Sequence, residues 1–356
     1  MTTSALDAPT PGLRLSGALR AQLLGLLRTA ALFIALSAVL FLLLGKAPWP
    51  LFMAMLEGAL GSGFALSETL VKAAPIVLCA LATALPARLG LVSVGAEGQL
   101  TVGAITGTAF VLLAGDALGA LTLPAMLLCG ALGGALLAAL AGVLRARLGA
   151  HETITTLLLN YAAPHFVAYL VYGPWKDAAS LGWPATISFP DAARLPTYFD
   201  TRLHAGLFAG VALVLLAHVV LTRTRYGLAL ELLRASPLLA ARAGLSLGTS
   251  VIVVMALGGA AAGIAGIAEA SVIESRLQLG VGVGAGYSGF LVAWLARGSL
   301  VRLITLSLLV AALTAAGDNL QLFAELPSAI VYVLQGLLFA AALIVQGRQA
   351  TAEEAR

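Results

Sequence analysis

Residues 119–144 read GALTLPAMLLCGALGGALLAALAGVL, a stretch without a charged side chain. A helix of about 20 such residues is long enough to cross the hydrocarbon core of a bilayer. The rest of the chain has the same character, because 60% of its 356 residues are hydrophobic and only 10% are charged. A soluble domain carries about 25% charged residues. The sequence therefore predicts an all-α integral membrane protein that is embedded in the lipid bilayer.

Apolar runs like 119–144 recur along the whole chain. We expect about ten transmembrane helices, of which the eighth and ninth are short and form a broken hairpin. The expected spans are residues 24–45, 69–86, 91–115, 119–144, 152–173, 204–222, 249–269, 287–298, 302–317 and 327–346. The corresponding domains are an N-terminal segment 1–22, a transmembrane domain 23–347 and a tail 348–356.

Most of the 20 Lys and Arg residues fall on one side of this threading. The positive-inside rule places that side, and with it both termini, in the cytoplasm. The two longest connections are then an external loop at 173–203 and a cytoplasmic loop at 223–248. Since the net charge of +4 is explained by this sidedness, we expect no nucleic-acid partner.

The motifs of several enzyme classes are missing from the sequence. The phosphate-binding pattern G-x-x-x-x-G-K-[ST] is absent, so the chain is not expected to hydrolyse ATP by itself. Its histidines and cysteines lack the spacing of a zinc site. We therefore expect neither an enzyme, nor a bound metal, nor a cofactor.

The segment Leu91–Leu100, LVSVGAEGQL, places Glu97 and Gln99 within an expected span, next to Gly95 and Gly98. Such glycines can interrupt a helix, and a half-helix that begins near Gly98 would aim free backbone N–H groups into the protein. A carboxylate at membrane depth is costly and points to function. Two interpretations stay open: Glu97 lines a translocation path, or it only caps the half-helix.

A second polar cluster follows at 151–161, HETITTLLLNY. Thr153, Thr156 and Asn160 have the helical spacing that puts them on one face. This face either lines a path or hydrogen-bonds to a neighbouring helix. His151 and Glu152, at the inner end of the span, are interpreted as interfacial.

Four segments stand out when they are taken together and in order: RLG at 88–90 with GAEGQ at 95–99, ETITTLLLNY at 152–161, residues 224–245, and GYSGF at 286–290. They resemble the permease subunits of ATP-binding-cassette importers. The nearest branch of that superfamily handles ribose-like sugars, nucleosides and branched-chain amino acids, and the string GAEGQ is most similar to nucleoside or simple-sugar permeases. The resemblance covers roughly residues 20 to 346.

This resemblance implies a permease subunit of an ATP-driven importer for nucleosides or related simple sugars. It also implies three partners: a second permease subunit in a heterodimer or homodimer, a cytoplasmic ATP-binding-cassette ATPase, and an extracytoplasmic solute-binding protein. The implied location is the bacterial plasma (inner) membrane.

The loop 223–248 would, by the same resemblance, couple the permease to its ATPase. The sequence departs from the usual family pattern there, with Glu231 in place of Arg, Arg234 in place of Gly, and Ser236 in place of Asn. The candidate coupling residues are Gly227, Glu231, Arg234, Pro237, Arg242 and Gly244.

Three alternatives to a nucleoside or sugar importer remain. An importer of the same family for branched-chain amino acids would share these motifs. An ion-coupled secondary transporter would need its own ion site, but Glu97 and Glu269 are almost the only deep carboxylates. A membrane-embedded enzyme would need clustered His, Asp or Glu residues, and the sequence shows no such cluster.

Overall fold

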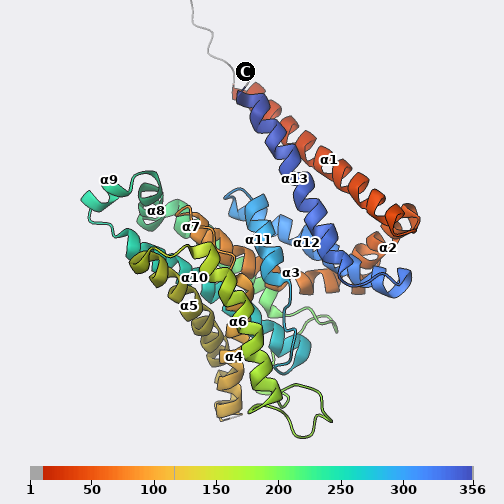
Figure 1. Cartoon of the computed structure of the whole chain (residues 1–356), viewed down its shortest axis with the longest axis vertical. Coiled ribbons are helices and arrows are strands. Elements are labelled where there is room, and N and C mark those ends of the chain that lie inside the picture. Colours follow the sequence, from red (N-terminus) through yellow and green to blue (C-terminus); the bar gives the residue numbers. More distant parts are fainter. Residues whose placement is uncertain (1–10, 116, 355–356) are drawn as a thin grey trace, which may run out of the picture. The chain divides into compact units, whose positions relative to one another are not determined.

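The structure is a computed structural model that describes residues 11–115 and 117–354, with side chains described from 24 to 347 except at 116. The chain is 77% helical, and no strand forms among the described residues, as Figure 1 shows. The predicted all-α class is confirmed. Residues 1–10, within the expected N-terminal segment, and 355–356, within the expected tail, lie outside the described residues.

The α-helices follow one another along the chain with mostly short connections. They are α1 (Pro11–Leu43), α2 (Pro48–Leu60), α3 (Gly63–Ala87), α4 (Ala96–Ala114), α5 (Thr122–Leu148), α6 (Glu152–Tyr172), α7 (Ala205–Arg223), α8 (Arg225–Ala235), α9 (Pro237–Arg242), α10 (Leu247–Glu269), α11 (Ala285–Leu295), α12 (Leu300–Ala324) and α13 (Ile330–Glu354). Short 3-10 turns lie at Gly119–Leu121 and Asp191–Ala193, and α10 continues as a π-helix over Ala270–Glu274.

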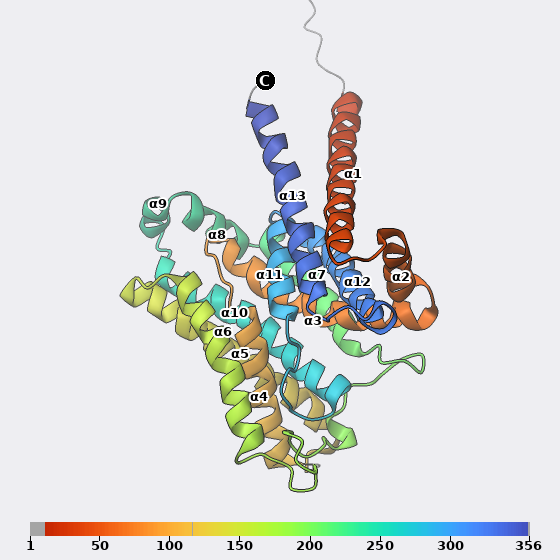
Figure 2. The ribbon, with the colours of Figure 1, turned by 45° about the vertical axis from the view of Figure 1, so that its right-hand side comes forward.

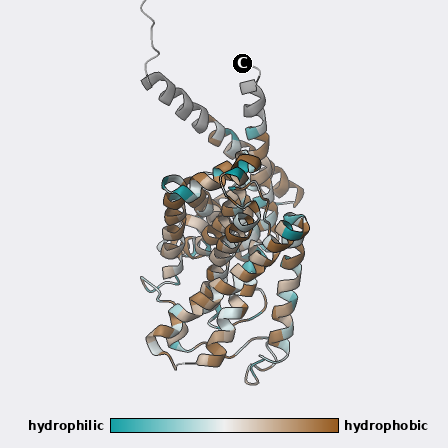
Figure 3. Cartoon of the chain, turned by 90° about the vertical axis from the view of Figure 1, so that its left-hand side faces the viewer, coloured by the Kyte–Doolittle hydropathy of each residue, from teal (hydrophilic) through white to brown (hydrophobic). Residues whose placement is uncertain are grey.

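Nine helices within the described part of the chain are long and apolar enough to cross a membrane, and α11 is a shorter apolar helix. Together they correspond in order to the ten expected spans. Figure 3 shows hydrophobic residues along most of these helices.

The expectation that the eighth and ninth spans are short is confirmed for α11 and wrong for α12, so the two do not form the expected broken hairpin. α12 has 25 residues and continues past the end predicted at residue 317. The charged residue Asp318 ends the apolar run in the sequence. In the structure it forms an ion pair with Lys72 of α3 at 2.8 Å. Because the charge has a partner, the helix does not need to stop there. The sequence also missed α2, a 13-residue helix that has Pro48 at its start, where proline is favoured.

The chain divides into two compact units, one formed by residues 11–54 and 320–354 and the other by residues 55–319. In the first unit α1 packs against α13. Both helices continue through the boundaries expected at residues 22 and 347. All candidate site residues belong to the second unit, which Figure 2 shows from another side.

Glycine contacts hold α4, α5 and α10 together in the second unit. A Cβ on Gly263 of α10 would lie 2.1 Å from the carbonyl oxygen of Gly130 on α5, and one on Gly103 of α4 would lie 2.3 Å from the Cα of Gly263. Small residues allow such close backbone approach in lipid, where dispersion packing replaces the hydrophobic drive. The position of α4, which carries Glu97, is therefore set by direct backbone contact with its neighbours.

Candidate functional site

Residues 91–95, between α3 and α4, form a non-helical segment. α4 begins at Ala96, with Glu97 in its first turn. The sequence placed this start near Gly98, two residues later. Gly98 lies inside the helix, where a Cβ would be 2.9 Å from Oδ1 of Asn160. Glycine is needed there for close approach to α6 and does not interrupt the helix.

Two threonines of α6 provide hydrogen-bond partners for the backbone of residues 91–95. Thr153 Oγ1 donates to the carbonyl oxygen of Val92 at 2.9 Å. The N–H of Val94 donates to Thr156 Oγ1 at 3.2 Å. Backbone polar groups away from water must be paired, and here side chains replace the missing helical partners.

Asn160 extends this pairing by one further turn of α6. Its Nδ2 donates to the carbonyl oxygen of Val94 at 2.7 Å, and its Oδ1 accepts from the N–H of Gly98 at 2.8 Å. One buried amide therefore joins the non-helical segment to the first turn of α4. Gln99 is also buried, and a Cβ on Gly95 would lie 2.7 Å from its Nε2.

Glu152 belongs to the same arrangement, although the sequence interpretation treated it as interfacial. Only 6% of the residue is exposed. Its Oε1 accepts from the N–H of Val92 at 3.3 Å, and its Oε2 lies 3.3 Å from Nε of Arg145 at the end of α5. The signal for this role is the four-residue spacing of Glu152, Thr156 and Asn160, which puts all three on one helix face.

The carboxylate of Glu97 binds the start of α11. Oε1 accepts from the N–H of Gly284 at 2.7 Å, and Oε2 accepts from the N–H of Gly286 at 2.8 Å. A negative charge is favourable at a helix N-terminus, where N–H groups lack intrahelical partners. The interpretation that Glu97 caps the helix in which it lies was therefore wrong about the helix, because Glu97 caps α11 and not α4.

A glycine-rich turn presents these N–H groups to Glu97. Gly280, Gly282 and Gly284 have φ values of +85°, +63° and +87°, a region that residues with a Cβ rarely adopt. A Cβ on Gly286 would lie 2.2 Å from the backbone nitrogen of Glu97. The repeat GVGVGAG at 280–286 therefore combines a tight turn with close packing of α11 on α4.

A small cavity of about 50 Å³ lies beside Glu97. Thr101, Pro164 and Gln278 are among its lining residues, together with the turn at 279–283. Such a volume holds water, but pockets for small molecules usually measure about 300 Å³ or more. This cavity is therefore too small to hold a nucleoside.

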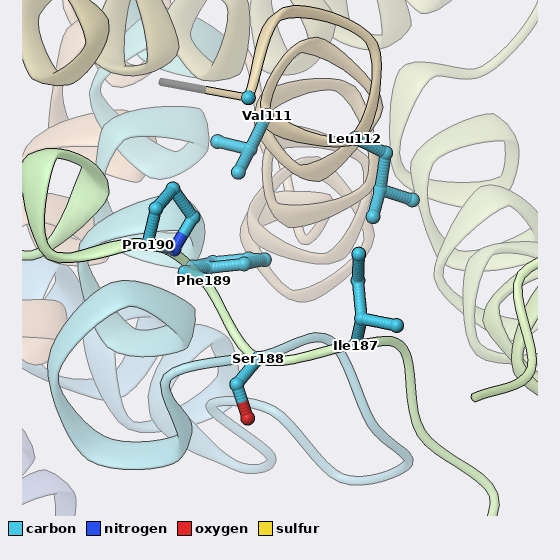
Figure 4. A pocket seen from close by; sticks show the side chains of 7 residues that line it. Val111, Leu112, Ile187, Ser188, Phe189 and Pro190 are labelled. Atoms are coloured by element: carbon cyan, nitrogen blue, oxygen red, sulfur yellow. The ribbon is translucent and has the colours of Figure 1, made fainter. Parts of the chain in front are cut away.

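A larger cavity of about 260 Å³ lies between the end of α4 and residues 187–190 of the long connection. Figure 4 shows Val111, Leu112 and Phe189 around it. Val111 is 14 positions after Glu97 on α4, a separation of roughly 20 Å along a helix. This apolar cavity is thus separate from the Glu97 site, and none of the sequence-predicted site residues lines it.

The candidate coupling segment folds as the two short helices α8 and α9, which Figure 1 shows at one end of the second unit. Five of the six candidate coupling residues are exposed, namely Glu231, Arg234, Pro237, Arg242 and Gly244. The sixth, Gly227, is buried, and a Cβ there would lie 1.9 Å from the carbonyl oxygen of Leu221. Gly227 therefore allows the tight junction between α7 and α8.

Leucines on α8 and α9 divide into a packed set and an exposed set. Leu230 and Leu233 are buried and attach α8 to the bundle. Leu228, Leu238 and Leu239 are exposed by 68%, 66% and 54%. α8 and α9 therefore expose apolar side chains as well as the charges of Glu231 and Arg234.

The family described as "Branched-chain amino acid transport system / permease component" matches residues 65–343, which include the Glu97 site, α8, α9 and α11. The chain belongs to this family of ATP-binding-cassette permeases. No solved structure matches it.

Three characterised permeases are similar to this one along most of its length. The glucose ABC transporter permease protein TsgB13 of Haloferax volcanii is 33% identical over 86% of this chain and 83% of its own length. The guanosine ABC transporter permease protein NupP of Bacillus subtilis is 27% identical over 86% and 88%. The nucleoside ABC transporter permease protein NupB of Lactococcus lactis is 26% identical over 85% and 86%. Second permease proteins of the latter two species, NupQ and NupC, match over shorter stretches.

Membership of this family shows which component of the transporter this chain is. It is the membrane-spanning permease component, and ATP hydrolysis belongs to a separate ATPase. The structure brings Glu97, Thr153, Thr156 and Asn160 together around residues 91–98, and it places the coupling candidates on α8 and α9.

Proposed function

We propose that this permease imports nucleosides or simple sugars in an ATP-driven complex. The observation that carries the proposal is similarity, over 85% or more of the chain, to permease proteins for glucose, guanosine and nucleosides. The family description names branched-chain amino acids, which keeps that solute class as the alternative within the same family.

The proposed complex contains a second permease subunit, a cytoplasmic ATPase and an extracytoplasmic solute-binding protein, in the bacterial plasma membrane with both termini cytoplasmic. The matches to two guanosine permease proteins from one species, NupP and NupQ, support a heterodimer. The small size of the cavity beside Glu97 supports a path that is completed by a second subunit.

We assign ATPase docking to α8 and α9. Exposed leucines beside charged residues are typical of a surface that another protein covers. Leu228, Leu238 and Leu239 supply the apolar part, and Glu231 and Arg234 supply charges of opposite sign. A docked ATPase would thus act on the bundle through the buried leucines Leu230 and Leu233.

The proposed path includes Glu97, Gln99, Thr153, Thr156 and Asn160. In the structure these side chains are buried or half-buried and, with the exception of Gln99, bind backbone groups. Non-helical backbone at membrane depth is tolerated where it lines a cavity or is buried in protein. A solute could replace these hydrogen bonds with its own hydroxyl groups when the site opens.

Reconstitution of the permease in liposomes with the second permease subunit, the ATPase and the solute-binding protein of the proposed complex tests the function. Radiolabelled guanosine, D-glucose and leucine are supplied together with the binding protein, and uptake is measured with and without ATP on the ATPase side. We expect ATP-dependent uptake of guanosine or glucose. Uptake of leucine alone would establish the amino-acid alternative, and uptake driven by an ion gradient without ATPase would contradict the proposal.

A further inference from the structure

The helix α11 is fixed at both ends by side chains from other helices. Glu97 of α4 binds the N–H groups at its start. At the other end, Nη2 of Arg88 donates to the carbonyl oxygen of Gly298, in the turn between α11 and α12, at 2.7 Å. Arg88 lies directly after the last residue of α3. An 11-residue helix, roughly 16 Å long, thus separates two polar attachments.

Between these attachments α11 lies directly on the backbone of α3. A Cβ on Gly289 would be 2.6 Å from the nitrogen of Ala80 and 2.6 Å from the Cβ of Cys79. Gly289 precedes Gly298 by nine residues, and Ala80 precedes Arg88 by eight. The two helices therefore run in the same direction and touch at two levels, which makes them move together.

The candidate coupling helix α8 is connected to Arg88 through α7 and α3. α8 packs against α7, and α7 packs against α3, where a Cβ on Gly210 of α7 would lie 3.3 Å from Cγ of Leu78. Arg88 directly follows α3 and also lies within electrostatic reach of α8. Burial is the main cause that lowers the pKa of Arg88 from its ordinary value, while Glu231 acts to raise this pKa and Arg234 acts to lower it. Both residues are exposed on α8. A protein that binds Glu231 or Arg234 will change the electrostatic potential at the Arg88 guanidinium, because Glu231 favours its positive charge and Arg234 opposes it.

We propose that Arg88 is a positioning residue that links α8 to the Glu97 site, with α11 as the rigid element between them. This inference rests on the proposed function. A displacement of α8 reaches Arg88 through α7 and α3. The hydrogen bond to Gly298 passes the displacement to the end of α11, and the start of α11 then moves relative to Glu97. The path opens or closes because the bonds from Gly284 and Gly286 to Glu97 break or form.

The test follows the start of α11 directly. A single cysteine is introduced at the exposed Val283 in a chain whose Cys79 and Cys129 are replaced by alanine. The rate of its labelling by a water-soluble maleimide is measured in the assembled complex, without nucleotide and with ATP and vanadate. We expect nucleotide to change this rate in the reference chain. Arg88→Gln should reduce the change by roughly tenfold, the factor for one lost hydrogen bond from a charged donor. Its ATP hydrolysis, measured separately without vanadate, should continue.

Two variants separate positioning from folding. Arg88→Lys keeps the charge and a donor and should restore part of the nucleotide effect. Arg147→Gln removes the same charge from an exposed position on α5 and should leave the effect unchanged. Assembled complex is quantified by size-exclusion chromatography for each, so that loss of subunits is recognised.

Each result decides the proposal. A nucleotide effect in Arg88→Gln equal to that of the reference chain overturns the role of Arg88. No nucleotide effect in a reference complex that hydrolyses ATP overturns the role of α11. If the wild-type complex neither hydrolyses ATP nor takes up guanosine or D-glucose, the proposed function itself fails, and the inference fails with it.

Discussion

The carboxylate of Glu97 lies 2.7 Å from the backbone nitrogen of Gly284, a residue 187 positions later in the chain. This contact joins the first turn of α4 to the first turn of α11. It places a negative charge at the N-terminus of a helix that is too short to span a bilayer. The strength of this attachment governs how readily the two helices separate.

Glu97→Gln tests the attachment. The amide keeps one acceptor oxygen but turns an NH₂ group toward a backbone N–H. One of the two hydrogen bonds is therefore lost, and the other is no longer charge-assisted. We expect uptake to fall by roughly tenfold or more, because such a bond is worth about 1.5–3 kcal/mol. Uptake and expression are measured together, with the exposed Glu57→Gln as control. Unchanged uptake would show that the charge of Glu97 does not contribute to transport.

Gly286→Ala tests the close packing of α11 on α4. The new Cβ would lie 2.2 Å from the nitrogen of Glu97, so the helices must separate. We expect a loss of stability of about 1–3 kcal/mol, as for other overpacked sites, seen as a lower melting temperature in detergent. Gly336→Ala is the matched control, since a Cβ there meets nothing within 4 Å. An equal melting temperature for the two variants would contradict the packing.

Asn160→Ala tests the support of the non-helical segment. The change leaves the carbonyl of Val94 and the N–H of Gly98 without their side-chain partner, at a cost of about 1–3 kcal/mol for each unpaired group. Thr155→Ala is the control, because Thr155 Oγ1 bonds only to the carbonyl of His151 on its own helix. We expect faster proteolysis or hydrogen exchange around residues 91–98 in Asn160→Ala alone.

His204 predicts a pH dependence of stability. Its Nδ1 accepts from the N–H of Gly206 at the start of α7, and burial lowers the pKa of His204 to about 4 from 6.5. Since the folded chain binds this proton less readily than the unfolded chain, stability is fully present above pH 6.5 and is lost as the pH falls toward 4. The loss reaches about 3 kcal/mol, at about 1.4 kcal/mol for each pKa unit.

The matched variant for this prediction is His204→Asn, which keeps an N-cap acceptor but does not titrate. Melting temperatures in detergent are compared between pH 7.5 and pH 4.5 for both proteins. The wild-type chain should lose more stability than the variant over this interval. Parallel pH profiles would show that His204 is protonated in the folded chain.

Charge reversal on α8 tests ATPase docking. Glu231→Lys and Arg234→Glu should weaken association with the ATPase and make the remaining binding respond differently to salt, because charges at an interface mainly set specificity and association rate. Melting of the isolated permease should not change, since both side chains are exposed. Normal association and uptake in both variants would remove α8 from the docking surface.

Hydrophobicity was sufficient to predict the all-α membrane class and the order of the apolar helices. Ten apolar segments could be recognised as helices. In lipid the backbone N–H and C=O groups of a segment must hydrogen-bond to one another, and a long apolar run achieves this as a helix. The ends were less accurate where a charge has a distant partner, as at Asp318 with Lys72. The helix α2 was missed because its apolar run is too short to span a membrane.

The polar residues of the site could be identified from their unusual position in apolar runs, but their partners could not. Thr153, Thr156 and Asn160 share a helix face by spacing alone, yet only the folded chain shows that this face pairs with residues 92–98. Likewise, nothing local connects Glu97 to Gly284 or Arg88 to Gly298. Helix formation follows from interactions a few residues apart, whereas these bonds depend on how α3, α4, α6 and α11 pack, and close glycine contacts between distant segments decide that packing.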